Sequence, residues 1–67
     1  MRVRVDQVER QMGAAAGKTL EEVLGVSEVF ASGCLNDEVY ILDDVAGKRI
    51  AIAPSALTQR YKPPAPA

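Results

Sequence analysis

The residues most suggestive of chemistry are 12–19, MGAAAGKT, a run of small side chains ending in glycine, lysine and threonine. A phosphate-binding loop needs the spacing G-x-x-x-x-G-K-[ST], so that successive backbone N–H groups surround the phosphates. Counting back from Gly17, the first glycine of that motif falls on Met12, and a loop starting at Gly13 is one residue too short. The preceding DQVERQ is also too polar for the buried strand that such a loop follows. We therefore expect no nucleotide binding and interpret the segment as a linker.

The cysteine and the acidic residues are the other candidates for catalysis or metal binding. Cys34 has no histidine to take its proton, because the chain contains none, and the usual zinc ligand sets are missing for the same reason. Neighbouring acids on a strand point to opposite faces, and the spacing of a calcium loop is absent. Asp37, Glu38, Asp43 and Asp44 are thus expected to be solvated turn residues. The sequence predicts a non-enzymatic protein without cofactor or metal.

Length and charge limit the functions further. A chain of 67 residues makes one small domain, and a lone cysteine forms no internal disulfide, so we expect self-association or a partner protein to support the fold. The net charge of −1 provides no general attraction to nucleic acid or anionic membranes. No apolar run approaches the roughly 18 residues of a membrane span. Together with the single free cysteine, this favours a cytoplasmic location.

The N-terminal segment is expected to form a strand and then a helix. In MRVRV the valines and arginines alternate with the period of a half-buried strand. Asp6 and Glu9 have the spacing of a capping box at the start of a helix that fades at Gly13. The apolar stripe of this helix comprises Val5, Val8 and Met12.

A second, short helix is predicted in TLEEVLG. Thr19 and Glu22 match the T-x-x-E capping box, and Gly25 is a typical residue to end the helix. The side chains expected to face the core are Leu20, Val23 and Leu24.

The clearest signal is EVYILDDVAGKRIAIA, two β-rich runs around a turn rich in Asp and Gly, which predicts an antiparallel hairpin. The first run has two apolar faces, Val39 with Ile41 and Tyr40 with Leu42, as in a central strand. In the second run we expect Ile50 and Ile52 to point to the core and Arg49 to point outward. Pro54 ends this strand, and PSAL is expected to form one helical turn that buries Leu57.

These elements predict a small α+β domain over residues 1–60, with an N-terminal strand, one or two short helices and a hairpin or three-stranded meander. Residues 61–67 are expected to form a flexible proline-rich tail. GKRIAIAPSALTQ resembles the end of SH3-like barrels, in which a strand reaches a proline and makes a helical turn, here at Pro54 and Leu57. The resemblance implies an SH3-like fold, without the aromatic groove that binds proline-rich peptides.

Residues 26–36 fit either a helix or a strand, because Val26, Val29 and Phe30 suit both patterns. LGVSEVFASGCLND resembles the turn and second helix of the helix-turn-helix in Cro-type phage repressors, with G-V-S at the turn and L-N near the helix end. That resemblance implies Ser27, Glu28 and Ser32 near DNA and a dimer made through the hairpin. The segment contains no Lys or Arg, so its charge disfavours DNA binding.

The function we expect is that of a small protein-interaction module, homodimeric and acting by steric binding to another protein, as compact inhibitors and adaptors of phages and other mobile elements do. The alternative is a small Cro-like DNA-binding regulator. An exposed edge of the N-terminal strand or of the hairpin is available for pairing with a copy. The predicted interaction residues are an apolar patch and a basic edge: Val26, Val29, Phe30, Tyr40 and Leu42, with Arg2 and Arg4.

Overall fold

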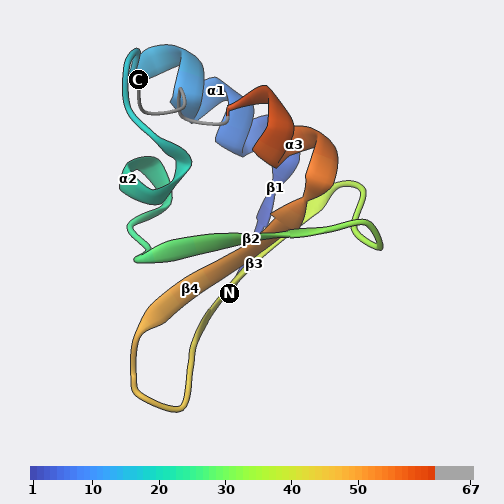
Figure 1. The fold of residues 1–67 in the computed structure, drawn as a ribbon. Helices are drawn as coiled ribbons and strands as arrows, with labels where there is room; N and C mark the ends of the chain where they lie inside the picture. The colour runs from blue at the N-terminus through green and yellow to red at the C-terminus, as the bar shows by residue number, and fades with distance from the viewer. Residues whose placement is uncertain (62–67) are drawn as a thin grey trace, which may run out of the picture.

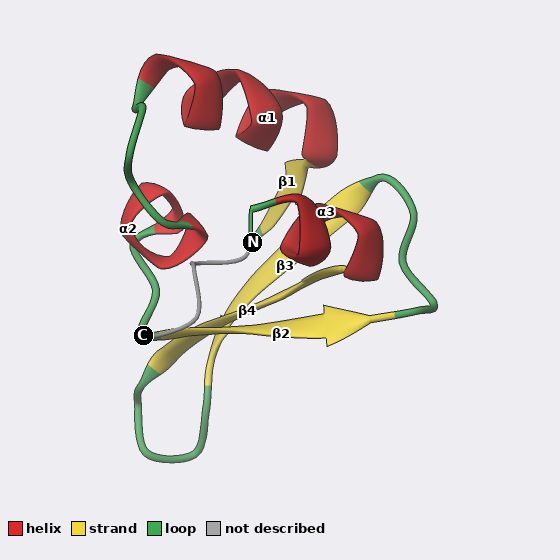
Figure 2. Cartoon of the chain, turned by 45° about the horizontal axis from the view of Figure 1, so that its top comes forward, coloured by secondary structure: helices red, strands yellow, loops and turns green. Residues whose placement is uncertain are grey.

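The computed structural model describes residues 1–61 as one four-stranded sheet with three helices on one side of it (Figures 1 and 2). This arrangement confirms the expected small α+β domain. The predicted tail lies outside the described residues except for Tyr61, which packs against the core. The elements in chain order are β1 (Arg2–Arg4), α1 (Val5–Ala14), α2 (Leu20–Leu24), β2 (Glu28–Ser32), β3 (Glu38–Asp43), β4 (Arg49–Pro54) and α3 (Ser55–Arg60).

The strands lie in the order β1-β3-β4-β2, and the sheet is mixed. The predicted hairpin is confirmed by the antiparallel pairing of β3 with β4, and β3 is central because β1 pairs with its other side. The three-stranded meander is wrong, since β2 pairs in parallel with β4 and not with β3. Both hairpin strands are therefore internal, and the edges belong to β1 and β2. The turn after Pro54 is present, but this open mixed sheet does not confirm an SH3-like barrel.

Helix α1 begins at Val5, directly after β1, and Arg4 occupies the cap position. The capping box predicted from Asp6 is wrong: Asp6 lies in the first turn, where its carboxylate accepts the N–H of Gln7 at 2.9 Å. Val5 donates its N–H to the carbonyl of Asp37 at 2.8 Å. The first N–H group of the helix therefore has a backbone partner next to β3 and needs no side-chain cap. Val8 and Met12 are buried as predicted.

Helix α2 has the ends that the sequence predicts. The Thr19 hydroxyl accepts the N–H of Glu22 and the Glu22 carboxylate accepts the N–H of Thr19, both at 3.2 Å, which confirms the capping box. Gly25 ends the helix in the left-handed region with φ 70°. Leu20 is buried in the core, and the other two apolar residues of the helix pack against it.

Residues 28–32 form a strand, so the recognition helix implied by the Cro-type resemblance is wrong. The N–H of Ser27 donates to the carbonyl of Arg49 at 2.8 Å and starts the parallel pairing of β2 with β4. Val26 is buried beside the turn at Gly25, which directs the following residues into the sheet. Within residues 1–61, nothing in the 26–36 segment is helical.

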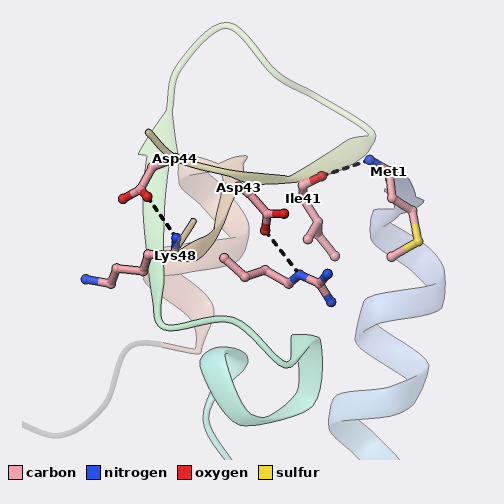
Figure 3. A network of polar contacts seen from close by, with 6 residues as sticks. Met1, Ile41, Asp43, Asp44 and Lys48 are labelled. Carbon is pink, nitrogen blue, oxygen red and sulfur yellow. Dashed lines mark hydrogen bonds and ion pairs between the residues drawn. The ribbon is translucent and has the colours of Figure 1, made fainter. Parts of the chain in front are cut away.

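The turn between β3 and β4 is held by its own acidic residue (Figure 3). The carboxylate of Asp44 accepts the backbone N–H groups of Ala46 and Lys48, both at 2.9 Å. Asp43 forms an exposed ion pair with Arg49 across the two strands at 3.5 Å. Asp44 thus orders the turn through its carboxylate, as aspartate commonly does in turns.

Replacing Gly13 or Gly25 by alanine should change the free energy of unfolding in opposite directions. Neither Gly13, in α1, nor Gly25 has an atom within 4 Å of an added Cβ, so only backbone conformation decides the effect. Gly13→Ala should raise the free energy of unfolding by about 0.5 kcal/mol, because alanine favours the helix. Gly25→Ala should lower it by roughly 1–2 kcal/mol, because φ is 70° there. Urea denaturation followed by circular dichroism measures both; a Gly25→Ala variant as stable as the wild type would contradict the assigned helix end.

Candidate functional site

The two faces of β4 differ in the size of their side chains. Toward the helices β4 directs Ala51 and Ala53, which have no exposed surface. Because side chains alternate along a strand, Ile50 and Ile52 lie on the opposite face, where they are half-buried. The prediction that these isoleucines point to the core is therefore wrong. The helices rest on β4 through its small residues, and the larger side chains of this strand lie on the face that no described helix covers (Figure 2).

This uncovered surface, which we call the open face, is organised in rows across the strands. One row runs through all four strands, because Arg2 pairs with Tyr40, Tyr40 with Ile52, and Ile52 with Phe30. In the next row Leu42 pairs with Ile50, which pairs with Glu28. Side chains directly opposite in this way are about 4.5–5.5 Å apart at Cβ, so the apolar members are in contact. The apolar part of the open face is Phe30, Tyr40, Leu42, Ile50 and Ile52.

The open face is accessible to a partner. Phe30 is 46% exposed and Leu42 is 43% exposed. Single exposed apolar residues are ordinary, but adjacent ones in a contiguous patch mark interaction surfaces. These residues lie on three neighbouring strands, so the pairing of the strands fixes their relative positions.

Charged residues of both signs border the open face. Arg2 and Glu38 approach to 3.9 Å, and both are substantially exposed, so the ion pair contributes about 0–1 kcal/mol. Arg4 pairs with Asp6 at 3.5 Å and Glu28 stands at the β2 edge. The basic edge predicted from the two arginines is present, but carboxylates lie beside it and offset its charge. The border therefore carries charges of both signs that largely offset each other.

The structure brings together only part of the predicted interaction patch. Phe30, Tyr40 and Leu42 share the open face as expected, with Arg2 and Arg4 at its β1 side. Val26 is buried at 8% exposure and Val29 packs against the core from the helix side, so assigning these two residues to the exposed patch is wrong. The reason is the period of two in β2, which separates Val29 from Phe30.

Sequence reasoning missed Ile50 and Ile52 as members of the open face. The signal that could have found them is their alternation with the two alanines of β4, since helices pack closely where side chains are small. The assumption that the larger residues of an alternating strand face the core hid this signal.

Within residues 1–61 no three His, Cys, Asp or Glu side chains are grouped as a metal site would require. Cys34 is exposed, in the loop between β2 and β3. The part of the chain that the structure describes has no buried side-chain nitrogen or oxygen without a hydrogen-bond partner. The open face is thus the feature of the described residues that most resembles a functional site.

Comparison with protein-family models, curated protein sequences and solved structures found no match to this chain. Among residues 1–61, no helix has the length and apolar character needed to cross a membrane.

The orientation of β4 gives a direct test. Ala51→Leu should lower the free energy of unfolding by about 1–3 kcal/mol, because it inserts a large side chain beneath the helices. The matched control is Ala31→Leu on β2, where the alanine is exposed and the change should stay within about 0.5 kcal/mol. Urea denaturation of both variants measures the difference. Equal stabilities would show that β4 turns its alanines away from the helices.

Proposed function

We propose that this chain is a small non-enzymatic protein-interaction module, homodimeric, that acts by covering part of another protein with its open face. The observation that carries the proposal is the placement of five large apolar side chains on the uncovered face while two alanines face the helices. Because β4 directs its isoleucines away from the helices, they contribute less to the stability of the free domain than residues in the core do. Burial against a partner would recover that contribution, at about 25 cal/mol per Å² of apolar surface.

The open face has the composition of an interface core with a polar border. Phe30 and Tyr40 are aromatic anchors, a residue class that dominates the energetics of many interfaces, and Ile52 of β4 lies between them in the row. The charged residues of β1 and β3 at the border fix the orientation of the partner. The effect on the partner is steric, as in compact inhibitors and adaptors, and the lone cysteine is consistent with the cytoplasm as the location.

The DNA-binding alternative lacks the element on which it depended, because residues 28–32 form a strand. Strands also enter DNA grooves in some proteins, but phosphate contacts require an excess of Lys and Arg. Each arginine at the β1 side of the open face has a carboxylate within 4 Å. We therefore favour a protein partner.

A photo-crosslinking amino acid at position 42 tests the proposal in the cells that produce the protein. Leu42 lies on the open face, so light should give a discrete covalent adduct with a partner protein. The matched control is position 45, since Val45 is also apolar and fully exposed but lies in the hairpin turn. Mass spectrometry of the adducts from both positions identifies the partner.

The yield of the crosslinked adduct should depend on the aromatic side chains of the open face. Tyr40→Ala in the crosslinking protein should reduce the adduct from position 42 about tenfold, the effect of losing an interface anchor. A folded variant that gives an undiminished adduct would contradict the proposed face. Absence of any adduct from position 42, or equal yields of adduct from positions 42 and 45, would also count against the proposed face. Retention of the protein on DNA at low salt would favour the DNA-binding alternative.

A further inference from the structure

We infer that two copies of the chain pair through β2, antiparallel and with Phe30 opposite Phe30 of the copy, so that the two sheets become one. This inference rests on the homodimer in the proposed function and names the surface that makes it. The occupant of the edge is a second copy of the same chain.

The two edges of the sheet differ in their suitability for pairing with a copy. β1 has only three residues and leads directly into α1. If two β1 strands paired antiparallel about Val3, Arg2 of each copy would lie opposite Arg4 of the other, and like charges in that position are destabilising. Short length and charge are the usual means by which proteins protect a sheet edge. The β1 edge is therefore protected against pairing with itself.

β2 lacks this protection. Its five residues, EVFAS, contain no proline, lysine or arginine, and it pairs with β4 on one side only. Its single charge, Glu28, stands at one end of the strand. In an antiparallel pair centred on Phe30, Glu28 lies opposite Ser32 of the copy, so no two like charges meet.

The backbone of β2 is compatible with this pairing. Met1 and Ile41 exchange both backbone hydrogen bonds, at 2.7 and 2.8 Å, so Ile41 directs its N–H and C=O toward β1 and the opposite residue, Ala51, directs its own toward β2. In a parallel pair only one of two opposite residues faces the other strand, so Val29, opposite Ala51, directs its N–H and C=O away from the sheet, and Ala31 does the same. In the proposed register Val29 lies opposite Ala31 of the copy at two equivalent points, which gives about four hydrogen bonds.

The helices leave this edge open. Ala31 is exposed even though its side chain lies on the helix side of the sheet. Beside it, α2 and α3 border a cavity of about 360 Å³, whose lining includes Leu20, Val29 and Thr58. In Figure 2, β2 lies along the front of the sheet with no described element beyond it. A strand of a second copy thus reaches β2 without displacing a helix.

Pairing through β2 would extend the open face. Antiparallel strands in one sheet are related by a two-fold axis perpendicular to the sheet, so both open faces point to the same side. The two Phe30 side chains become cross-strand neighbours at the junction, where aromatic pairs stabilise a sheet. The result is one apolar surface made by two copies, bordered at its far ends by the arginines of each β1.

Charge at position 32 tests the pairing and its register. Ser32→Glu places a carboxylate opposite Glu28 of the copy at two equivalent points, and it should weaken the dimer about tenfold. Ser32→Lys places an ammonium there and should strengthen the dimer by a similar factor. Both changes remove the contact in which the Ser32 hydroxyl accepts the N–H of Cys34 at 3.3 Å, so their difference isolates charge. Sedimentation equilibrium over a range of concentrations measures the dissociation constants.

The double variant Glu28→Lys/Ser32→Glu provides the rescue. It restores opposite charges across the pair, so its dimer should return to within about threefold of the wild type. Circular dichroism of each variant checks that the monomer fold is retained. Changes in the same direction for Ser32→Glu and Ser32→Lys, or a mass that stays monomeric at millimolar concentration, would overturn the inference.

Other modes of association give different results. Dissociation by Leu42→Asp, with no response to charge at position 32, would indicate packing of two open faces and overturn the edge pairing. Growth beyond a dimer would indicate that β1 of one copy binds β2 of the next, which also overturns it. The experiments distinguish failure of the pairing through β2 from failure of partner binding by the open face. A monomeric mass with a position-42 adduct would leave the partner-binding face standing, whereas a charge-sensitive dimer without that adduct would leave only the pairing.

Discussion

The contact between the helices and β4 determines what the rest of the molecule can present. Ala51 and Ala53 are fully buried beneath the helices, and the alternation of side chains then places Ile50 and Ile52 on the other face. As a result, two of the three isoleucines of the chain lie outside the core. Among residues 1–61 the buried core consists of nine side chains, and two of these are alanines, so the core is small. A small core together with an uncovered apolar face is the combination expected where a second protein surface completes the burial.

The parallel pairing of β2 with β4 is the second constraint, because it decides which strands lie at the edges. Residues 33–37 carry the chain from β2 past the end of β4 to β3, so the hairpin lies inside the sheet. The internal position completes the backbone hydrogen bonds of the two longest strands. It leaves a short basic strand at one edge and a longer, mostly uncharged strand at the other. The same topology that stabilises the hairpin therefore gives the two edges opposite tendencies toward self-pairing.

The features that the sequence predicted are those decided by neighbouring residues, namely the capping box and glycine end of α2, the hairpin and the turn after Pro54. Orientation of β4 was not predictable from alternation alone, because β3 beside it is apolar on both faces and allows either choice. The strand at 28–32 depends on a partner about twenty residues further along the chain, which no local pattern reveals. Val26 and Val29 were misplaced for the same reason: their surroundings are created by β4 and the helices.

Phe30 links the two surfaces, since its side chain lies on the open face and it stands at the centre of the proposed pairing through β2. Pairing at the edge would bring two open faces to the same side, so a partner with two matching sites would bind the second at a high effective concentration. By thermodynamic reciprocity, such a partner would strengthen the dimer by the factor by which dimerisation strengthens its own binding. The coupling acts through separable groups, because the edge uses backbone N–H and C=O and the open face uses the ring. A change at Ser32, whose side chain lies opposite Glu28 of the copy in the proposed register and which stands outside the apolar part of the open face, therefore separates self-association from partner binding in a way that a change at Phe30 does not.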